Sequence, residues 1–189
     1  YKELLNFCTV DLSAFYFDIR KDTLYCDEFD SQKRKSTIIL LNVILNALLK
    51  WFAPILSFTT EEIFRLISKN NKSIHLEKFL NFPSSFKNEA LNNKWQELIK
   101  IRNICNISIE EKRASKEIGS SLEAELKIDL NDKFKDITKN IDFSELCITS
   151  KATISFSTIT ETEVSTIKAK GFKCPVCWKI SEELCPRHS

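Results

Sequence analysis

The most apolar stretch of the chain, residues 38–64, reads IILLNVILNALLKWFAPILSFTTEEIF. Its apolar length is close to what a bilayer requires, so a membrane span is one interpretation. Polar residues interrupt the stretch at intervals of four, which aligns them along one narrow stripe of a helix: Asn42, Asn46 and Lys50. Pro54 then disfavours a helical conformation at Ala53. The pattern therefore favours two helices joined at Ala53-Pro54 over a single membrane span.

The second of these two helices has its own start signal. Thr59 and Glu62 have the spacing of a capping box, with Thr59 as the N-cap. This helix is predicted to run to about Lys69. The first helix, residues 38–53, is apolar nearly all round, which is typical of a helix surrounded by other elements. We therefore expect it at the centre of an all-helical core.

Two further segments show helical spacing of their apolar residues. Residues 1–19 form one, and the charged segment 18–27 either prolongs that helix or turns out of it. The other runs from Glu89 to Arg113, with apolar residues in three- and four-residue steps at Leu91, Trp95, Leu98, Cys105 and Ile109. Arg102 lies on the same line and should reach solvent or pair with a carboxylate. These helices predict a mainly α fold, an antiparallel helix bundle over residues 1–115.

The hydrophobic period changes after the bundle. Residues 122–130 alternate strictly between apolar and charged side chains, which predicts a half-buried strand. A short helix is expected over residues 134–141. Short β-branched runs predict three further strands, over residues 146–148, 152–156 and 164–169. Residues 116–170 are therefore expected to form a small α/β region.

Composition restricts the class of protein less sharply. A length of 189 residues suits one domain of ordinary size, or one with a small appendage. The net charge of +2 is too small to indicate a nucleic-acid binder by itself. No secretory signal pattern is visible, and four cysteines lie scattered in apolar segments, which favours a reducing cytoplasm: Cys8, Cys26, Cys105 and Cys147. Because the chain has no Met and opens in a helical pattern at Tyr1, we expect an N-terminal part to precede it.

The sharpest chemical signal is at the C-terminal end. Cys174 and Cys177 form a Cys-x-x-Cys pair, and Cys185 and His188 form a Cys-x-x-His pair. Two such pairs can complete the tetrahedron that Zn²⁺ prefers, because zinc accepts mixed sulfur and nitrogen ligands. With four ligands the site would be closed and structural. The alternative is a redox dithiol or unpaired thiols, since a single Cys-x-x-Cys is ambiguous.

No arrangement of catalytic residues is recognisable. The chain has two His and two Gly, and it shows no paired acid and base, Ser-His-Asp set or glycine-rich phosphate loop. His75 stands alone among apolar neighbours, which favours a structural or surface role. Trp178 beside the predicted zinc site could stack on an unpaired RNA base, or could instead brace the metal-binding loop.

Several segments together resemble one known family. They are DLSAFYFDIRKDTLYCD (11–27), APILSFTTEEIF (53–64), SIHLEKF (73–79), the W-x-x-L-x-x-I-R pattern (95–102), EKRASKEIGSSLEAEL (111–126) and KCPVCW (173–178). In this order they are similar to segments of bacterial isoleucyl-tRNA synthetases, and the resemblance covers essentially the whole chain. Related class I synthetases for valine and leucine share the helical bundle, whereas IGSSLEA and the terminal CPxCW favour isoleucine.

The resemblance implies three parts: a helical anticodon-binding domain (1–115), a small α/β region (116–170) and a zinc-binding tail that touches tRNA (171–189). It implies isoleucine tRNA as partner, through its anticodon stem-loop, for a cytoplasmic, monomeric ligase without membrane contact. Candidate tRNA-binding residues in the tail are Trp178, Lys179, Arg187 and Lys173. ATP and Mg²⁺ would be used only by a catalytic domain that this chain lacks, since the family's HIGH and KMSKS signatures are both absent.

The tail departs from the family in two places. His188 stands where the family usually has a fourth cysteine, so a ligand beyond Ser189 remains an alternative to it. The Pro175-Val176 pair lacks the basic residue that the family often carries between the first two cysteines. Two alternative functions remain: a helical protein-interaction module with a structural zinc site, and the same domain of a valine or leucine synthetase. By itself the chain is expected to be inactive as an enzyme.

Overall fold

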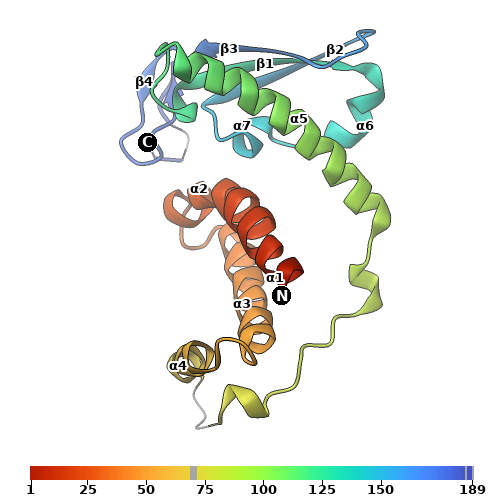
Figure 1. Ribbon diagram of the computed structural model, residues 1–189. Helices are drawn as coiled ribbons and strands as arrows, with labels where there is room; N and C mark the ends of the chain where they lie inside the picture. Colours follow the sequence, from red (N-terminus) through yellow and green to blue (C-terminus); the bar gives the residue numbers. More distant parts are fainter. Residues whose placement is uncertain (69–71, 186, 189) are drawn as a thin grey trace. The chain divides into compact units, whose positions relative to one another are not determined.

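The computed structural model describes residues 1–68, 72–185 and 187–188, and these are rich in helix with a small sheet region (Figure 1). The chain divides into two compact units. One consists of Tyr1–Cys26 together with Asn88–Ser189, and the other of Asp27–Lys87. These units do not follow the three parts expected from the sequence, and that division stays a prediction.

The first unit begins with an uninterrupted helical segment. It consists of α1 (Lys2–Asn6), the π-helical η1 (Phe7–Phe17) and α2 (Asp18–Cys26). The charged segment at residues 18–27 therefore prolongs the first helix, which was one of the two outcomes expected. Leu12, Ile19 and Thr23 are its buried residues, and they lie on one face of the segment.

Helix α5 (Glu89–Ala114) is the long helix of this unit and confirms the predicted bounds within a residue. It begins where the side chain of Asn88 accepts a hydrogen bond of 2.9 Å from the amide of Leu91, as expected of an N-cap. Its buried residues recur at helical spacing: Leu98, Ile101, Cys105 and Ile109. Of the two alternatives expected for Arg102, the pairing with a carboxylate is confirmed, because its Nη2 lies 3.6 Å from Asp18. Its Nε also donates to the Leu146 carbonyl at 2.8 Å.

The sheet has the strand order β2–β1–β3, with β1 (Ala124–Asn131) in the centre. Strand β2 (Lys151–Ser157) runs parallel to β1 and β3 (Glu163–Lys168) antiparallel to it. The alternation in the sequence is confirmed, since every second residue of β1 is fully buried: Ala124, Leu126, Ile128 and Leu130. The parallel connection contains η5 (Asp132–Phe134), α6 (Lys135–Thr138) and α7 (Phe143–Leu146).

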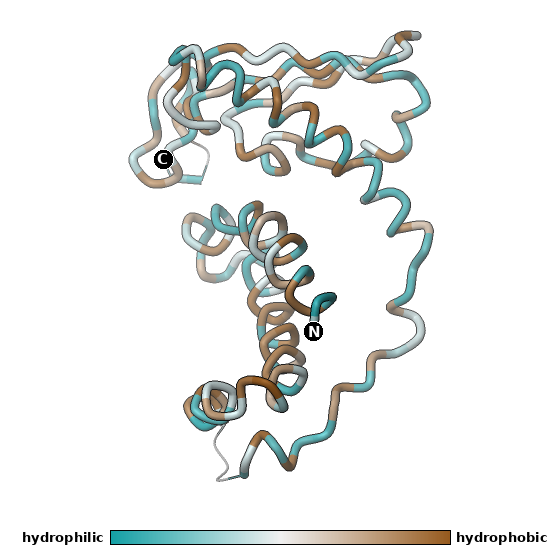
Figure 2. Tube along the Cα trace, viewed as in Figure 1, coloured by the Kyte–Doolittle hydropathy of each residue, from teal (hydrophilic) through white to brown (hydrophobic). Residues whose placement is uncertain are grey.

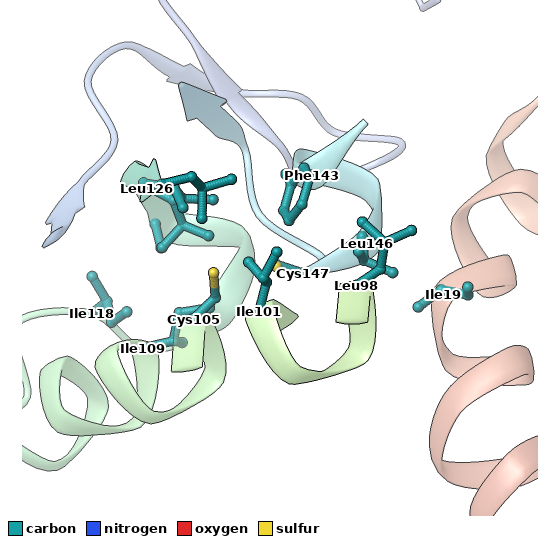
Figure 3. Close-up of a cluster of buried hydrophobic side chains, with 13 residues drawn as sticks. Ile19, Leu98, Ile101, Cys105, Ile109, Ile118, Leu126, Phe143, Leu146 and Cys147 are labelled. Carbon is teal, nitrogen blue, oxygen red and sulfur yellow. The ribbon is translucent and has the colours of Figure 1, made fainter. Parts of the chain in front are cut away.

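One apolar core joins these elements. It is built from α2, α5, β1 and α7, and from Ile118 between α5 and the sheet, so the small α/β region shares its core with the helices (Figure 3). The strand predicted over residues 146–148 is wrong. Leu146 ends α7, whose N-cap Asp142 accepts from the amides of Ser144 and Glu145, and Ile148 has a left-handed φ of 56°. A short apolar run such as residues 146–148 is compatible with a strand or with the end of a helix, and here the N-cap Asp142 stabilises the helix.

The second unit contains α3 (Gln32–Phe52), α4 (Ser57–Ile67) and two short 3₁₀ turns, η2 (Ile74–Leu76) and η3 (Ser84–Phe86). Its core is small and lies at the C-terminal half of α3, with Leu49, Ala53, Phe64 and Ile74 buried. Lys50, one of the polar interruptions, is 9% exposed and pairs with Glu77 at 3.4 Å. His75 is exposed, which agrees with a surface role.

The other elements of this unit do not bury α3 all round, and its place at the centre of a larger helix bundle stays a prediction. Ile39 is 65% exposed, and Ile38, Leu40 and Val43 are also exposed, although the trace of α3 is largely coloured as hydrophobic in Figure 2. Among the described residues α3 is the one helix long and apolar enough to cross a membrane, and 22% of its apolar window is buried. Core helices of soluble proteins can meet the same criterion.

The predicted capping box is also wrong. Helix α4 begins three residues earlier, at Ser57, because its N-cap is Leu56, which makes no side-chain cap. The turn after Pro54 already aligns the Leu56 carbonyl, which accepts from the Thr60 amide at 2.9 Å and from the Thr60 hydroxyl at 3.0 Å. Thr59 therefore lies inside the first helical turn. The predicted helix end at Lys69 falls outside the described residues, and α4 ends at Ile67.

Candidate metal centre

A small hairpin holds the first two cysteines together. Strands β4 (Phe172–Lys173) and β5 (Ile180–Ser181) pair antiparallel, and the four-residue Cys174–Cys177 turn lies between them. Two hydrogen bonds close the turn, from the Trp178 amide to the Cys174 carbonyl at 3.0 Å and from the Cys174 amide to the Lys179 carbonyl at 2.9 Å. Closing the turn requires Trp178 to adopt a left-handed φ of 64°.

The four predicted ligands do come together. The ligand atoms of Cys174, Cys177, Cys185 and His188 all lie within 4.8 Å of one another. The Sγ atoms of Cys177 and Cys185 are 3.8 Å apart, and Nδ1 of His188 is 3.5 Å from Sγ of Cys174 and 3.3 Å from Sγ of Cys185. A tetrahedral ion with sulfur ligands at about 2.3 Å separates them by about 3.8 Å. The spacing therefore fits a four-coordinate metal ion.

The electrostatics of the cluster lower the pKa of two of its three thiols. Hydrogen bonds from the backbone at Cys177 and Val176 lower the pKa of Cys174 to about 6. Burial raises the pKa of Cys185, but a hydrogen bond from the Arg187 backbone and contacts to Cys177 and His188 outweigh it, and the pKa lies below its usual value. Burial instead raises the pKa of Cys177. A cation bound at the centre would favour the ionised form of all three.

The second half of the cluster is attached to helix α2. Nε2 of His188 lies 2.8 Å from the carbonyl oxygen of Cys26, the last residue of α2. The neighbouring Arg187 pairs with Asp22 through two contacts, of 2.8 and 3.1 Å. Sequence reasoning found the four residues that cluster here but missed Asp22 and Cys26, because about 160 residues separate them from the tail and no local pattern marks them.

Comparisons with known proteins agree with this architecture. Residues 1–128 match the sequence model described as the anticodon-binding domain of tRNA ligase. The chain belongs to this family. The chain is 67% identical over 189 residues to the isoleucine–tRNA ligase of Pelagibacter ubique (strain HTCC1062), a match that covers 100% of this chain and 21% of the relative.

Other relatives carry the same name. The chain is 37% identical over 196 residues to the isoleucine–tRNA ligase of Agrobacterium fabrum (strain C58), and 37% identical over 194 residues to that of Bartonella henselae. Each match covers 97% of this chain and 20% of the relative. The chain thus spans about a fifth of the length of the curated relatives it matches.

In this anticodon-binding family member, the predicted tRNA-contacting residues of the tail fall into two groups. Trp178 is 58% exposed, and the ammonium of Lys173 lies 5.3 Å from the centre of its ring. Lys179 is half-buried and lies with Trp178 in the wall of a cavity of about 360 Å³ between the tail and α2. Arg187 instead faces Asp22, so its guanidinium is engaged within the protein.

The cavity has mainly apolar walls with charges at its edge. Its apolar lining comes from α2, the sheet region and the tail, and includes Tyr25, Leu122, Ile148, Val176 and Trp178. The carboxylates of Asp18 and Asp22 and the ammonium groups of Lys21 and Lys179 line it as well. Tyr25 is 83% exposed and Trp178 is 58% exposed, so the cavity has one accessible aromatic ring from α2 and one from the tail. Only the folded unit brings these residues together.

Proposed function

We propose that the chain is the tRNA-binding part of an isoleucine–tRNA ligase. One observation carries the proposal, the 67% identity to such a ligase over all 189 residues, in a chain whose first 128 residues match an anticodon-binding domain. Within it, we assign residues 1–115 to an antiparallel helix bundle that recognises the anticodon region. Residues 116–170 form a small α/β region that supports the tail, residues 171–189.

The whole protein is proposed to attach isoleucine to its tRNA at the expense of ATP. ATP and Mg²⁺ would act in a catalytic domain of the same protein, because this chain contains neither the HIGH nor the KMSKS signature. The chain alone is then inactive as a ligase. A cytoplasmic, monomeric enzyme without membrane contact follows from the same assignment.

The metal of the tail is proposed to be Zn²⁺ in a structural role. Three sulfur atoms and one imidazole nitrogen suit zinc, and four protein ligands leave no position for substrate. When bound, zinc holds the two halves of the tail together. The side chains on its surface then meet the RNA.

Recognition of RNA by this tail would rest on stacking and charge. A base unpaired in a loop can stack on the exposed ring of Trp178, while Lys173 and Lys179 approach its phosphates. Arg187 contributes to RNA contact only if it leaves Asp22, because their ion pair occupies the guanidinium. While the ion pair with Asp22 persists in the RNA complex, Arg187 orients the tail and does not contact the RNA.

The direct test is a gel-shift titration of the chain with isoleucine tRNA, at one fixed salt concentration, against valine and leucine tRNA as competitors. A preference for isoleucine tRNA supports the proposal. A preference for valine or leucine tRNA would assign the chain to that synthetase. Equal, weak binding of all three would favour a protein-interaction module with a structural metal site.

A matched pair of variants tests the tail. Trp178→Ala should weaken tRNA binding roughly 5- to 100-fold, the loss expected when a base loses its aromatic partner. Phe172→Ala is the control, because Phe172 is another exposed aromatic residue of the same hairpin and is even more accessible, at 83%. Equal losses in both variants, or none in Trp178→Ala, would remove Trp178 from the interface.

A further inference from the structure

We propose that His188 is a two-sided side chain, whose Nδ1 ligates the metal while its Nε2–H holds the C-terminal end of helix α2. Metal binding and attachment of the tail to α2 would then be one coupled step. This goes beyond the proposed tRNA binding, because it concerns how the tail is placed on the rest of its unit and not what the tail contacts.

The imidazole geometry supports this assignment. Nδ1 lies 3.5 and 3.3 Å from two cysteine sulfurs, and Nε2 lies 2.8 Å from the Cys26 carbonyl oxygen. A carbonyl can only accept, so Nε2 must carry the proton of that hydrogen bond. In a neutral imidazole the lone pair is then on Nδ1, which faces the cysteines. The hydrogen bond thus selects the tautomer that a metal needs.

The hydrogen-bond acceptor of His188, the Cys26 carbonyl, lies at the C-terminal end of α2. Cys26 is the last residue of α2, and the last carbonyls of a helix have no amide partner within it. His188 supplies such a donor from the other end of the chain. The adjacent Arg187 reinforces the attachment through its two contacts with Asp22, one turn earlier in α2.

Histidine and cysteine differ at this position in one respect that matters. Both can complete a tetrahedral site with three other cysteines. A metal-bound cysteine thiolate has no proton to donate in a hydrogen bond, whereas a metal-bound imidazole retains an N–H on the side away from the metal. A four-cysteine tail could therefore hold metal without holding α2, and His188 links the two.

The first experiment separates these two roles by hydrogen exchange in the 189-residue chain. In the metal-loaded wild type, amides in the last turn of α2 should be protected from exchange. Removing the metal with a chelator should speed their exchange by about fivefold or more, because the loss of one hydrogen bond changes an opening equilibrium by about that factor. His188→Cys should keep one equivalent of metal and yet lose the protection that the Nε2–H provides, while the part that depends on the Arg187–Asp22 pair remains. Amides of β1 serve as the internal reference, because the buried core around β1 contains no residue of the tail.

Wild-type protection of α2 in metal-loaded His188→Cys would overturn the proposal. Arg187→Gln is the control, since it removes the ion pair with Asp22 and leaves all four ligands in place. It should lose part of the protection, and chelation should still remove the rest. If chelation changes nothing in the wild type, coupling between metal and helix is absent.

A second experiment needs no substitution at His188. With spin-active cadmium as the metal probe and nitrogen-labelled histidine, the cadmium should couple to Nδ1, and a slowly exchanging proton should remain on Nε2. His75→Ala simplifies the spectrum, because His75 is the chain's other histidine and is exposed. Coupling to Nε2, or no coupling to His188, would refute the proposal even if His188→Cys fails to hold metal. Neither experiment involves tRNA, so failure of the proposed function leaves the result valid.

Discussion

The sheet and the C-terminal tail belong to the same compact unit but are ordered by different means. Alternate residues of β1 are fully buried against α5 and α7. In the tail large apolar side chains face outward, with Phe172 and Leu184 each 83% exposed, while the buried apolar residues among those described are Cys174 and Cys177, two of the predicted ligands. The interior of the sheet region is therefore a hydrophobic core, whereas the interior of the tail consists mainly of cysteine sulfur atoms.

This difference indicates where the ordering free energy comes from. Each apolar side chain buried in the sheet contributes roughly 1.5–3 kcal/mol. The tail has too few such side chains to offset the entropy of ordering its backbone, about 1–2 kcal/mol per residue. A structural metal can supply on the order of 10 kcal/mol, so the tail should depend on metal and the sheet should not.

The largest effect is expected from Cys174→Ala. It removes a ligand, so the tail should lose stoichiometric metal and most of the roughly 10 kcal/mol that metal binding supplies. Elemental analysis of protein purified without chelator measures the metal, and hydrogen exchange measures the tail. Protection of β1 should be unchanged. A full equivalent of metal in this variant would mean that another set of ligands binds it.

Leu126→Ala tests the opposite region. Leu126 is fully buried in β1, and truncating a buried leucine costs about 2–5 kcal/mol. Denaturant unfolding monitored by circular dichroism should show this loss, while metal content stays at one equivalent as long as the unit is folded. An unchanged free energy of unfolding would show that the buried face of β1 is not the source of stability.

Gly171→Ala tests whether the tail also needs its hairpin. Gly171 has a φ of +118°, and a Cβ there would overlap the carbonyl of Ser181 on β5. Strain of about 1–3 kcal/mol should weaken metal binding roughly 10- to 100-fold in a chelator competition. Gly119→Ala is the control, because its Cβ would meet only the flexible side chain of Glu123 at 3.3 Å. Equal metal affinity in both variants would show that a Cβ at position 171 does not strain the hairpin enough to affect metal binding.

The smallest effect concerns Asp142, which caps α7. Burial raises the pKa of Asp142, but hydrogen bonds from Ser144 and the Glu145 amide outweigh it, and the pKa lies below its ordinary value. A lowered folded pKa means that the carboxylate stabilises the fold above the ordinary value, about 3.9, and that this contribution is lost as pH falls through the folded value.

Asp142→Asn should therefore cost up to about 1 kcal/mol near pH 7, and the difference from wild type should vanish in acid. Unfolding titrations of both proteins between neutral pH and about pH 3 test this, within the range where both fold. A difference that stays constant over that range would mean that the charge of Asp142 does not contribute.

Local patterns predicted the elements that are decided locally. The strict alternation of residues 122–130 corresponds to β1, and the three- and four-residue steps from Leu91 correspond to α5. Errors occurred where a signal was short. The capping box at Thr59 failed because the turn after Pro54 starts α4 earlier, and the run at residues 146–148 failed because Asp142 caps a helix there.

The sequence by itself predicted which residues come together as a candidate metal site, because the paired spacing of Cys174, Cys177, Cys185 and His188 is local to 15 residues. It also determined the family, through segments distributed along the whole chain. The tertiary structure alone decided that the tail rests on α2, since Asp22 and Cys26 meet Arg187 and His188 only in the folded unit. Contacts across some 160 residues depend on the packing of every element between them, and no short sequence pattern encodes that packing.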